Sequence, residues 1–209
     1  MSEVKLRPNL TYCISAMFLL IVFKIFYRLS VTGQDNIPET GSAILVANHT
    51  SFLDPPMVAV SCKRHISFMG KAELFKVPIL STLLRSFETF PVNRNKVDLK
   101  AFRTAFGRLK QGRLLGVFPE GTRRRVGPKK MGSLEPGTAY LILKSGTPMI
   151  PVGISGTDKV IPTGKRLPRF PKVTVVIGKP VHFNIEKPSQ ENISEVTGRI
   201  EKDIVSLLV

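Results

Sequence analysis

Residues 43–54 read AILVANHTSFLD, and this stretch decides the fold class. The five apolar residues Ala43–Ala47 are too few for a helix and are typical of a strand that is buried on both faces. A short polar segment follows, and then Asp54-Pro55-Pro56, which is typical of the start of a helix. A buried strand that leads into a helix is the unit from which parallel sheets are built. The stretch therefore predicts an α/β fold.

Strand-like and helix-like segments alternate along the rest of the chain as well. The expected strands lie at residues 31–33, 66–69, 89–92, 114–118, 149–154 and 173–177. The expected helices lie at residues 54–61, 71–85, 98–111, 136–145 and 189–208. This alternation predicts a largely parallel sheet that is covered by helices on both faces. At 209 residues we expect one such domain over residues 31–209, preceded by a helical segment over residues 1–30.

The chain is strongly basic, since 31 Lys and Arg residues against 15 Asp and Glu residues give a net charge of +16. Such a field attracts nucleic acids, anionic membranes, or acidic ligands and carriers. The 13 Phe residues lie mostly in apolar runs, and no zinc-finger or ribonucleoprotein signature occurs. We therefore expect no nucleic-acid partner, and an anionic membrane surface instead. The two cysteines, Cys13 and Cys62, form no disulfide framework and favour a reducing compartment.

Residues 10–23 form an uncharged apolar run, LTYCISAMFLLIVF, with Lys5 and Arg7 before it and Lys24 and Arg28 after it. The run is shorter than the roughly 20 residues that a membrane span needs, and a buried core helix also fits its length. A signal peptide has a similar basic start and apolar centre, but no small-residue cleavage site follows the run. We favour a monotopic or peripheral anchor on the cytoplasmic face of the cell membrane, with basic flanks that meet anionic headgroups.

His49 and Asp54 are the candidate catalytic pair. His49 directly follows the apolar run, and a carboxylate at its side would let it take up and return a proton near neutral pH. No Gly-x-Ser-x-Gly motif occurs and neither cysteine lies in a catalytic signature, so the pair indicates a base that activates a substrate hydroxyl. A structural interpretation also fits, because Asp54 before two prolines is a good helix N-cap and Ser51-x-x-Asp54 is a capping-box variant.

Four of the expected strands end in polar groups, which are His49, Lys71, Arg94 and the Glu-Gly-Thr-Arg segment at residues 120–123. In parallel sheets, ligands bind outside the carboxyl ends of the strands. If these four strands are parallel neighbours, the four groups share one crevice. This arrangement favours a functional role for His49 over a purely structural one.

Four sequence blocks resemble those of a known family. They are residues 48–54 (NHTSFLD), 91–94 (PVNR), 118–123 (FPEGTR) and 150–152 (IPV). In this order and at these intervals they resemble the glycerolipid acyltransferase superfamily, and most closely the 1-acyl-glycerol-3-phosphate acyltransferases, also called lysophosphatidic acid acyltransferases. His-x4-Asp alone is a weak signal, whereas Phe-Pro-Glu-Gly-Thr-Arg is quite specific.

The resemblance implies an activity in phospholipid biosynthesis. His49, paired with Asp54, would be the general base that deprotonates the 2-hydroxyl of lysophosphatidic acid. The alkoxide would then attack the thioester of acyl-coenzyme A or of an acyl carrier protein, giving phosphatidic acid without any cofactor or metal. The motif residues equally fit glycerol-3-phosphate or another lysolipid as the acceptor. A non-catalytic phospholipid-binding protein is the alternative from a different class, and the intact pair disfavours it.

The resemblance also assigns the acceptor phosphate to Arg94 and Arg123, whose planar guanidinium groups suit bidentate contacts with phosphate oxygens. Lys71 is a third candidate for this phosphate site. Residues 123–130 and 159–172 are two basic loops. Either loop fits a role in binding the anionic donor or in docking on lipid headgroups.

The remaining binding candidates lie between these basic residues. Gly121 and Thr122 offer a backbone N–H and a hydroxyl in a tight turn. Glu120 is unsuited to direct phosphate binding because of its own charge. We expect it to orient the glycerol hydroxyls or to pair with an arginine.

Overall fold

The computed structural model describes residues 10–93, 97–123, 130–161, 167–184 and 188–209. Its seven strands form one sheet in the order β1-β7-β6-β2-β5-β3-β4. The strands are β1 (Ser30–Thr32), β2 (Ala43–Ala47), β3 (Ile66–Lys71), β4 (Phe90–Val92), β5 (Leu114–Val117), β6 (Met149–Ser155) and β7 (Thr174–Ile177). Every neighbouring pair in this sheet is parallel except β6 and β7. The prediction of a largely parallel α/β sheet is confirmed.

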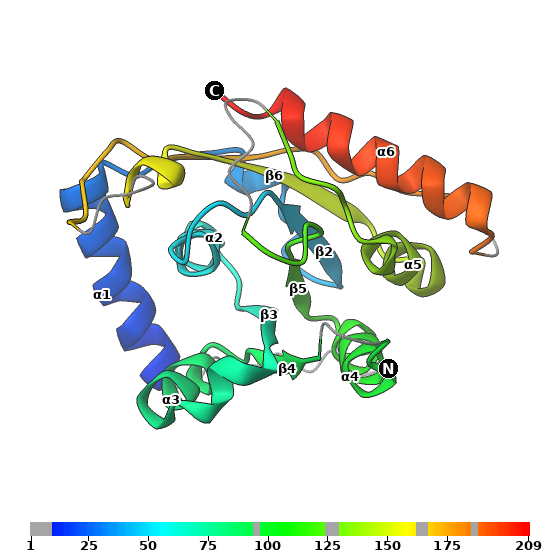
Figure 1. Ribbon diagram of the computed structural model, residues 1–209, viewed down its shortest axis with the longest axis horizontal. Helices are drawn as coiled ribbons and strands as arrows, with labels where there is room; N and C mark the ends of the chain where they lie inside the picture. Colours follow the sequence, from blue (N-terminus) through cyan, green and yellow to red (C-terminus); the bar gives the residue numbers. More distant parts are fainter. Residues whose placement is uncertain (1–9, 94–96, 124–129, 162–166, 185–187) are drawn as a thin grey trace.

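Helices cover both faces of the sheet, as the sequence predicted (Figure 1). The α-helices are α1 (Leu10–Tyr27), α2 (Asp54–Ser61), α3 (Pro78–Ser86), α4 (Leu99–Lys110), α5 (Pro136–Ser145) and α6 (Gln190–Ser206). Short 3-10 helices span Gln34–Asn36, Ala72–Lys76 and Thr157–Lys159. Helices α1 and α2 pack on one face of the sheet, and α4, α5 and α6 pack on the other.

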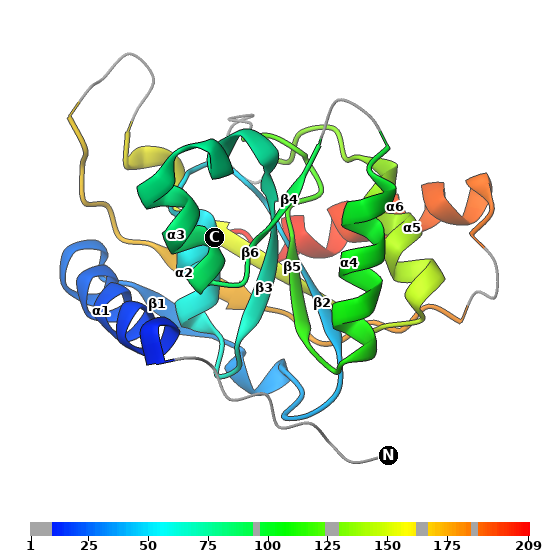
Figure 2. The same ribbon diagram turned by 90° about the horizontal axis from the view of Figure 1, so that it is seen from below.

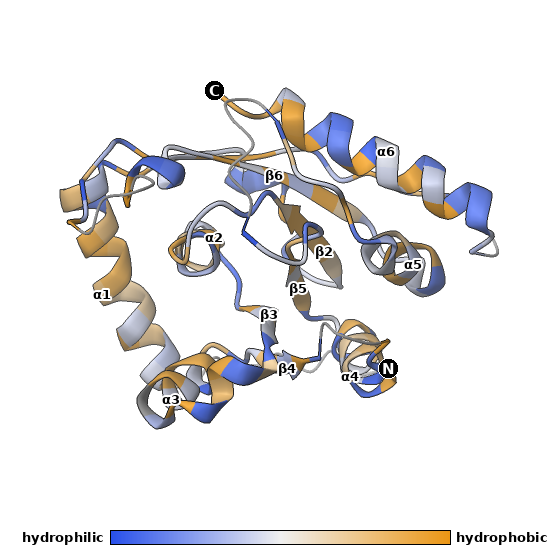
Figure 3. Cartoon of the chain, viewed as in Figure 1, coloured by the Kyte–Doolittle hydropathy of each residue, from blue (hydrophilic) through white to orange (hydrophobic). Residues whose placement is uncertain are grey.

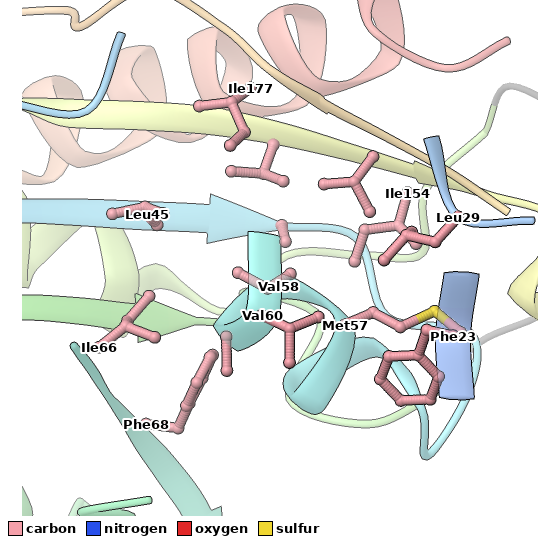
Figure 4. Packing of buried hydrophobic residues seen from close by; sticks show 14 of the residues in the cluster. Phe23, Leu29, Leu45, Met57, Val58, Val60, Ile66, Phe68, Ile154 and Ile177 are labelled. Atoms are coloured by element: carbon pink, nitrogen blue, oxygen red, sulfur yellow. The ribbon is translucent and has the colours of Figure 1, made fainter. Parts of the chain in front are cut away.

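Each face of the sheet has its own apolar core, and β2 contributes to both. Leu45 belongs to the core under α1 and α2, whereas its neighbours Ile44 and Val46 belong to the core under α4, α5 and α6. This division follows from the two-residue period of a strand. Figure 4 shows the first core, in which Met57 of α2 and Phe23 of α1 approach the sheet. Burial on both faces explains why β2 reads as a continuous apolar run.

The helix expected over residues 71–85 is interrupted. The structure has a 3-10 helix at Ala72–Lys76 and then α3 from Pro78, with Val77 in an extended conformation between them. Proline disfavours the helical conformation for the residue before it, which accounts for the break. The prediction of one continuous helical piece was therefore wrong at Val77.

Helix α1 lies along the surface of the domain. Its side chains Tyr12, Phe23 and Tyr27 are buried and fall on one stripe of the helix, whereas its other sides are mostly exposed and apolar. Figure 3 shows this apolar character over the middle and C-terminal part of α1. By length and composition α1 is long enough to cross a membrane, a test that core helices and signal sequences also pass. A core helix would be mostly buried, whereas only 17% of α1 is.

Candidate active site

The strands that carry the four polar groups lie side by side in the order β2-β5-β3-β4, and all of their pairings are parallel (Figure 2). This is the arrangement that a shared crevice requires. His49 follows β2, residues 120–123 follow β5, and Lys71 is the last residue of β3. They therefore lie at the same edge of the sheet. Arg94 follows β4 in the sequence but lies outside the described residues.

His49 and Asp54 form a hydrogen-bonded pair, with 3.0 Å between Nδ1 and Oδ2. The Asp54 side chain is fully buried, and its Oδ2 also accepts the backbone N–H groups of Thr50 and Ser51, each at 2.7 Å. An ionised carboxylate can only accept hydrogen bonds, so His49 Nδ1 carries a proton in this pair. The other ring nitrogen, Nε2, is then the one that can act as a base.

Asp54 does not act as a helix N-cap. It is the first residue of α2, and the N-cap position before it is Leu53, which makes no capping bond with its side chain. The Asp54 carboxylate instead binds backbone N–H groups of the preceding loop. The interpretation of Asp54 as the N-cap was therefore wrong. The capping-box variant Ser51-x-x-Asp54 has its hydrogen bonds, since Asp54 Oδ2 accepts the Ser51 N–H at 2.7 Å and Ser51 Oγ accepts the Leu53 N–H at 3.3 Å.

Asn48 fixes this loop to β6. Its side-chain Oδ1 accepts the N–H of Ile154 at 2.8 Å, and its Nδ2 donates to the carbonyl of the same residue at 2.9 Å. The last paired residues of β2 and β6 are Ala47 and Val152. The Asn48 amide side chain therefore continues the contact between the two strands beyond their last backbone pair. No role was predicted for Asn48, although it is the first residue of the 48–54 block and lies at the strand end.

Glu120 fixes the loop from the other side. Its carboxylate is buried, Oε1 accepts the backbone N–H of His49 at 2.8 Å, and Oε2 accepts the N–H of Gly132 at 2.9 Å. Burial raises the pKa of Glu120, and the two N–H donors oppose this rise because they favour the charged form. The sequence did not predict either of these partners. A contact between Glu120 and a glycerol hydroxyl stays a prediction.

Arg123 lies over an exposed aromatic ring. Its guanidinium carbon is 3.2 Å from the centroid of the Phe52 ring, which is a cation–π contact. Phe52 belongs to the loop between His49 and Asp54, so the contact joins the block after β5 to the block after β2. The predicted phosphate-binding side chain thus stands next to the loop at residues 48–54 that carries His49.

The other predicted binding residues are placed as follows. Gly121 has a φ of +64°, a conformation that side chains disfavour, and a Cβ there would lie 3.2 Å from Glu135. Thr122 is exposed at the same turn. Lys71 is half exposed, and its Nζ is 3.7 Å from the Glu73 carboxylate.

Among the described residues, no group of three or more His, Cys, Asp or Glu side chains is arranged to bind a metal ion.

The Acyltransferase family model matches residues 28–155, which is more than half of the chain and includes all four motif blocks. The chain belongs to the Acyltransferase family.

The chain matches nearly the full length of one relative and about half the length of another. It is 26% identical over 201 residues to the 1-acyl-sn-glycerol-3-phosphate acyltransferase of Bacillus subtilis, covering 94% of this chain and 95% of that protein. It is 29% identical over 180 residues to the chloroplastic 1-acyl-sn-glycerol-3-phosphate acyltransferase LPAT1 of Arabidopsis thaliana, covering 84% of this chain and 50% of that one. The chain thus spans about half the length of the chloroplastic relatives.

A solved structure has a similar fold. The crystal structure of the 1-acyl-sn-glycerophosphate acyltransferase PlsC from Thermotoga maritima is 28% identical in sequence and matches with a TM-score of 0.67. The match covers 92% of this chain and 81% of that one.

A cavity of about 460 Å³ adjoins the Glu120 turn of the acyltransferase. Apolar side chains from β5 and from helices α4 and α5, including Val117, Phe102 and Leu141, line part of its wall, and residues 118–122 line another part. An apolar pocket with a few polar groups at one side is typical of sites for small molecules.

Proposed function

We propose that this acyltransferase moves an acyl chain from a thioester donor to the 2-hydroxyl of 1-acyl-glycerol-3-phosphate, which yields phosphatidic acid. The observation that carries the proposal is the hydrogen bond between His49 and the buried Asp54 at the carboxyl edge of the sheet. A protein that only binds phospholipid has no need of such a base. The names of the Bacillus and Thermotoga relatives support this acceptor.

The geometry of the pair suggests the order of the proton transfers. Nε2 of His49 takes the proton of the acceptor hydroxyl while the hydroxyl oxygen attacks the thioester carbonyl carbon. The carbon–sulfur bond then breaks, and the imidazolium returns its proton to the departing thiolate. Asp54 fixes the tautomer beforehand and stabilises the imidazolium between the two steps. No covalent enzyme intermediate is required.

Asn48 and Glu120 act as positioning residues in this scheme. They tie the loop that carries His49 to β6 on one side and to the turn after β5 on the other. Because the Glu120 carboxylate accepts the N–H of His49 itself, it restrains the backbone from which the base projects. A base held in this way loses little freedom when the substrate arrives, which favours a reactive geometry.

Arg123 and Arg94 hold the acceptor phosphate in this proposal, with Lys71 as a further candidate. Arg123→Ala should raise the apparent KM for lysophosphatidic acid, by up to about 100-fold, because a charge-assisted bidentate contact is lost. Arg123→Lys should restore only part of the affinity, since a planar fork is replaced by a point charge. Steady-state kinetics at varied acceptor concentration measure this, and unchanged acceptor dependence in Arg123→Ala would contradict the assignment.

We assign the acyl chain of one substrate to the 460 Å³ cavity beside residues 118–122. Its apolar wall suits an alkyl chain, and its polar side lies at the motif that follows β5. The cavity is large enough for part of a long acyl chain.

We also propose that α1 lies in the membrane interface and does not cross the bilayer. Tyr12 near its start and Tyr27 at its end are both buried against the domain, so the helix is docked over its whole length. A helix held in this way presents its exposed apolar side chains sideways to lipid. The protein would then be monotopic, on the cytoplasmic face of the membrane, where its lysolipid acceptor resides.

A panel assay tests the proposed function. Purified protein is incubated with lysophosphatidic acid, glycerol-3-phosphate and neutral lysolipids, each with acyl-coenzyme A and with acyl carrier protein thioesters. We expect phosphatidic acid from lysophosphatidic acid and from no neutral lysolipid. Turnover of glycerol-3-phosphate alone would identify a sibling enzyme, and phospholipid binding without any turnover would support the non-catalytic alternative.

A further inference from the structure

The exposed apolar surface of α1 continues beyond the helix. Residues 159–161 and 167–172, here called the flanking loop, lie beside the C-terminal end of α1 (Figure 1). The Phe170 ring centroid is 5.4 Å from that of Phe26 and 5.5 Å from that of Tyr27. The Arg28 guanidinium donates a hydrogen bond of 3.2 Å to the Phe170 carbonyl. These contacts make the flanking loop and α1 one continuous surface.

The flanking loop exposes large apolar side chains on this surface. Leu167 is 80% exposed, and Ile161 and Phe170 are also exposed. Single exposed apolar residues are ordinary, but Phe170 packs against Phe26 and so extends the apolar surface of α1. Ile161 and Leu167 add exposed apolar side chains within the same loop, an accumulation that a soluble surface does not favour.

Basic side chains border this apolar area. Lys159, Arg169 and Lys172 of the flanking loop are exposed, and Lys24 and Arg28 stand at the end of α1. Apolar side chains bordered by cations match the chemistry of an anionic bilayer, whose acyl chains lie just below a layer of phosphates. An acidic protein partner would account for the cations but not for the exposed Leu167.

The flanking loop also connects this surface with the loop at residues 48–54 that carries His49. The 3-10 helix Thr157–Lys159 leads into it, and the Thr157 hydroxyl is 3.0 Å from the hydroxyl of Thr50, the residue after His49. Thr157 itself is buried. A lipid surface in contact with the flanking loop would therefore lie near the loop that carries His49.

We propose that the flanking loop is a second membrane-contacting element. Ile161 and Leu167 enter the boundary between headgroups and acyl chains beside α1, and Lys159, Arg169 and Lys172 meet the lipid phosphates. This contact turns the His49 crevice toward the bilayer that supplies the acceptor. The inference rests on the proposed membrane function of α1 and adds a second, separable site of contact.

Vesicle binding tests the apolar part of the proposal. The full-length Ile161→Ser/Leu167→Ser variant is compared with Leu99→Ser, which removes a side chain that is 64% exposed on α4, at the other face of the sheet. We expect the flanking-loop variant to bind vesicles of phosphatidylcholine and phosphatidylglycerol about tenfold more weakly than wild type. Leu99→Ser should bind like wild type. Equal binding by both variants would overturn the proposal.

Charge variants test the basic part. Arg169→Gln/Lys172→Gln should lower the preference for phosphatidylglycerol-containing vesicles over pure phosphatidylcholine vesicles by several-fold. Lys110→Gln/Lys144→Gln removes the same charge from exposed sites on α4 and α5 and should leave this preference closer to that of wild type. If the two pairs behave alike, only the overall charge matters, and the loop has no specific role.

Kinetics in free solution separate this inference from the proposed function. With a short-chain, monomeric lysophosphatidic acid and no vesicles, the flanking-loop variants should keep the wild-type rate with either donor. If vesicle binding is unchanged while the rate with an acyl carrier protein thioester falls, the loop binds the donor and the membrane assignment is wrong. If the wild type has no activity on any acceptor, the proposed function fails, and vesicle binding still decides the role of the loop.

Discussion

Two histidines lie beside carboxylates at opposite edges of the same sheet. His49 follows β2 at the carboxyl edge, with its Nδ1 3.0 Å from Asp54 Oδ2. His65 precedes β3 at the amino edge, with its Nδ1 3.9 Å from Glu88 Oε1. Because β2, β5 and β3 are all parallel, the two sites are separated by the length of the strands.

The partners of the two carboxylates differ. Asp54 accepts hydrogen bonds from an imidazole and from two backbone N–H groups, and none of these carries a fixed charge. Glu88 pairs with the guanidinium groups of Arg108 and Arg113. The carboxylate at the amino edge is therefore neutralised by arginine and has little charge left with which to stabilise an imidazolium.

Burial and the two arginines both favour the neutral form of His65. Burial lowers its pKa to about 4, and the charges of Arg113 and Arg108 contribute to this shift. Its ring packs against Tyr12 of α1, with 3.7 Å between the centroids. A histidine near a carboxylate is therefore suited to proton transfer only where no other cation pairs with that carboxylate. At the amino edge His65 instead packs against the start of α1, and Glu88 pairs with the two arginines.

The largest expected difference between the two edges is in turnover. His49→Ala should lower kcat by about 100- to 10,000-fold, because the general base is lost. His65→Phe keeps an aromatic ring against Tyr12 and should retain turnover close to that of wild type. Initial rates with a saturating acyl donor measure both variants, and circular dichroism verifies their folding. Wild-type turnover by His49→Ala would end the proposed mechanism.

Removal of the carboxylate charges should affect the two edges in different ways. Asp54→Asn should lower kcat severely, though less than His49→Ala, because the imidazole loses its orientation and charge partner. Glu88→Gln should instead lower the free energy of unfolding by about 1–3 kcal/mol, because two partly buried guanidinium groups lose their partner. Denaturant titration and kcat are measured on both variants. A loss of kcat in Glu88→Gln as large as that in Asp54→Asn would erase the distinction.

A third, smaller effect should follow from the support of His49. In Glu120→Gln one carboxylate oxygen becomes an NH2 group, which faces the N–H of either His49 or Gly132. We expect kcat to fall by about 10- to 100-fold, because small displacements of a catalytic group are costly. The acceptor KM should change little. Glu191→Gln, an exposed change on α6, is the control. A variant that raises KM and spares kcat would show that Glu120 contacts the acceptor.

The smallest expected effect concerns pH and the amino edge. The pKa of His65 is about 4 in the folded protein and 6.5 for the ordinary side chain. As pH falls from 6.5 toward 4, the unfolded chain takes up a proton that the folded protein does not, so stability is lost in this window. The wild type should lose roughly 1–2 kcal/mol more than His65→Phe across it. Denaturant midpoints at a series of pH values measure the difference, and parallel curves would show that His65 does not titrate on unfolding.

The fold class, the positions of most elements and the pairing of His49 with Asp54 could all be predicted from the sequence. The apolar run at Ala43–Ala47 can be recognised locally because a strand buried on both faces has no polar position. His49 and Asp54 are five residues apart in the sequence, so their hydrogen bond also depends on near neighbours. The break at Val77 could also have been predicted locally, because Val77 precedes a proline. The helix-like pattern of the residues on both sides of Val77 favoured a continuous helix instead.

The distant groups that support the loop at residues 48–54 follow from the tertiary structure and could not be predicted from the sequence. Glu120 meets the backbone of His49 across 71 residues, and Asn48 meets Ile154 across 106 residues. These partners depend on the order and register of β2, β5 and β6, and on the loops that follow them. Nothing in the residue pattern distinguishes a buried carboxylate such as Glu120 from one that faces a substrate. Burial is a property of the packed chain, and so is the difference between a histidine whose carboxylate is free and one whose carboxylate is neutralised by arginine.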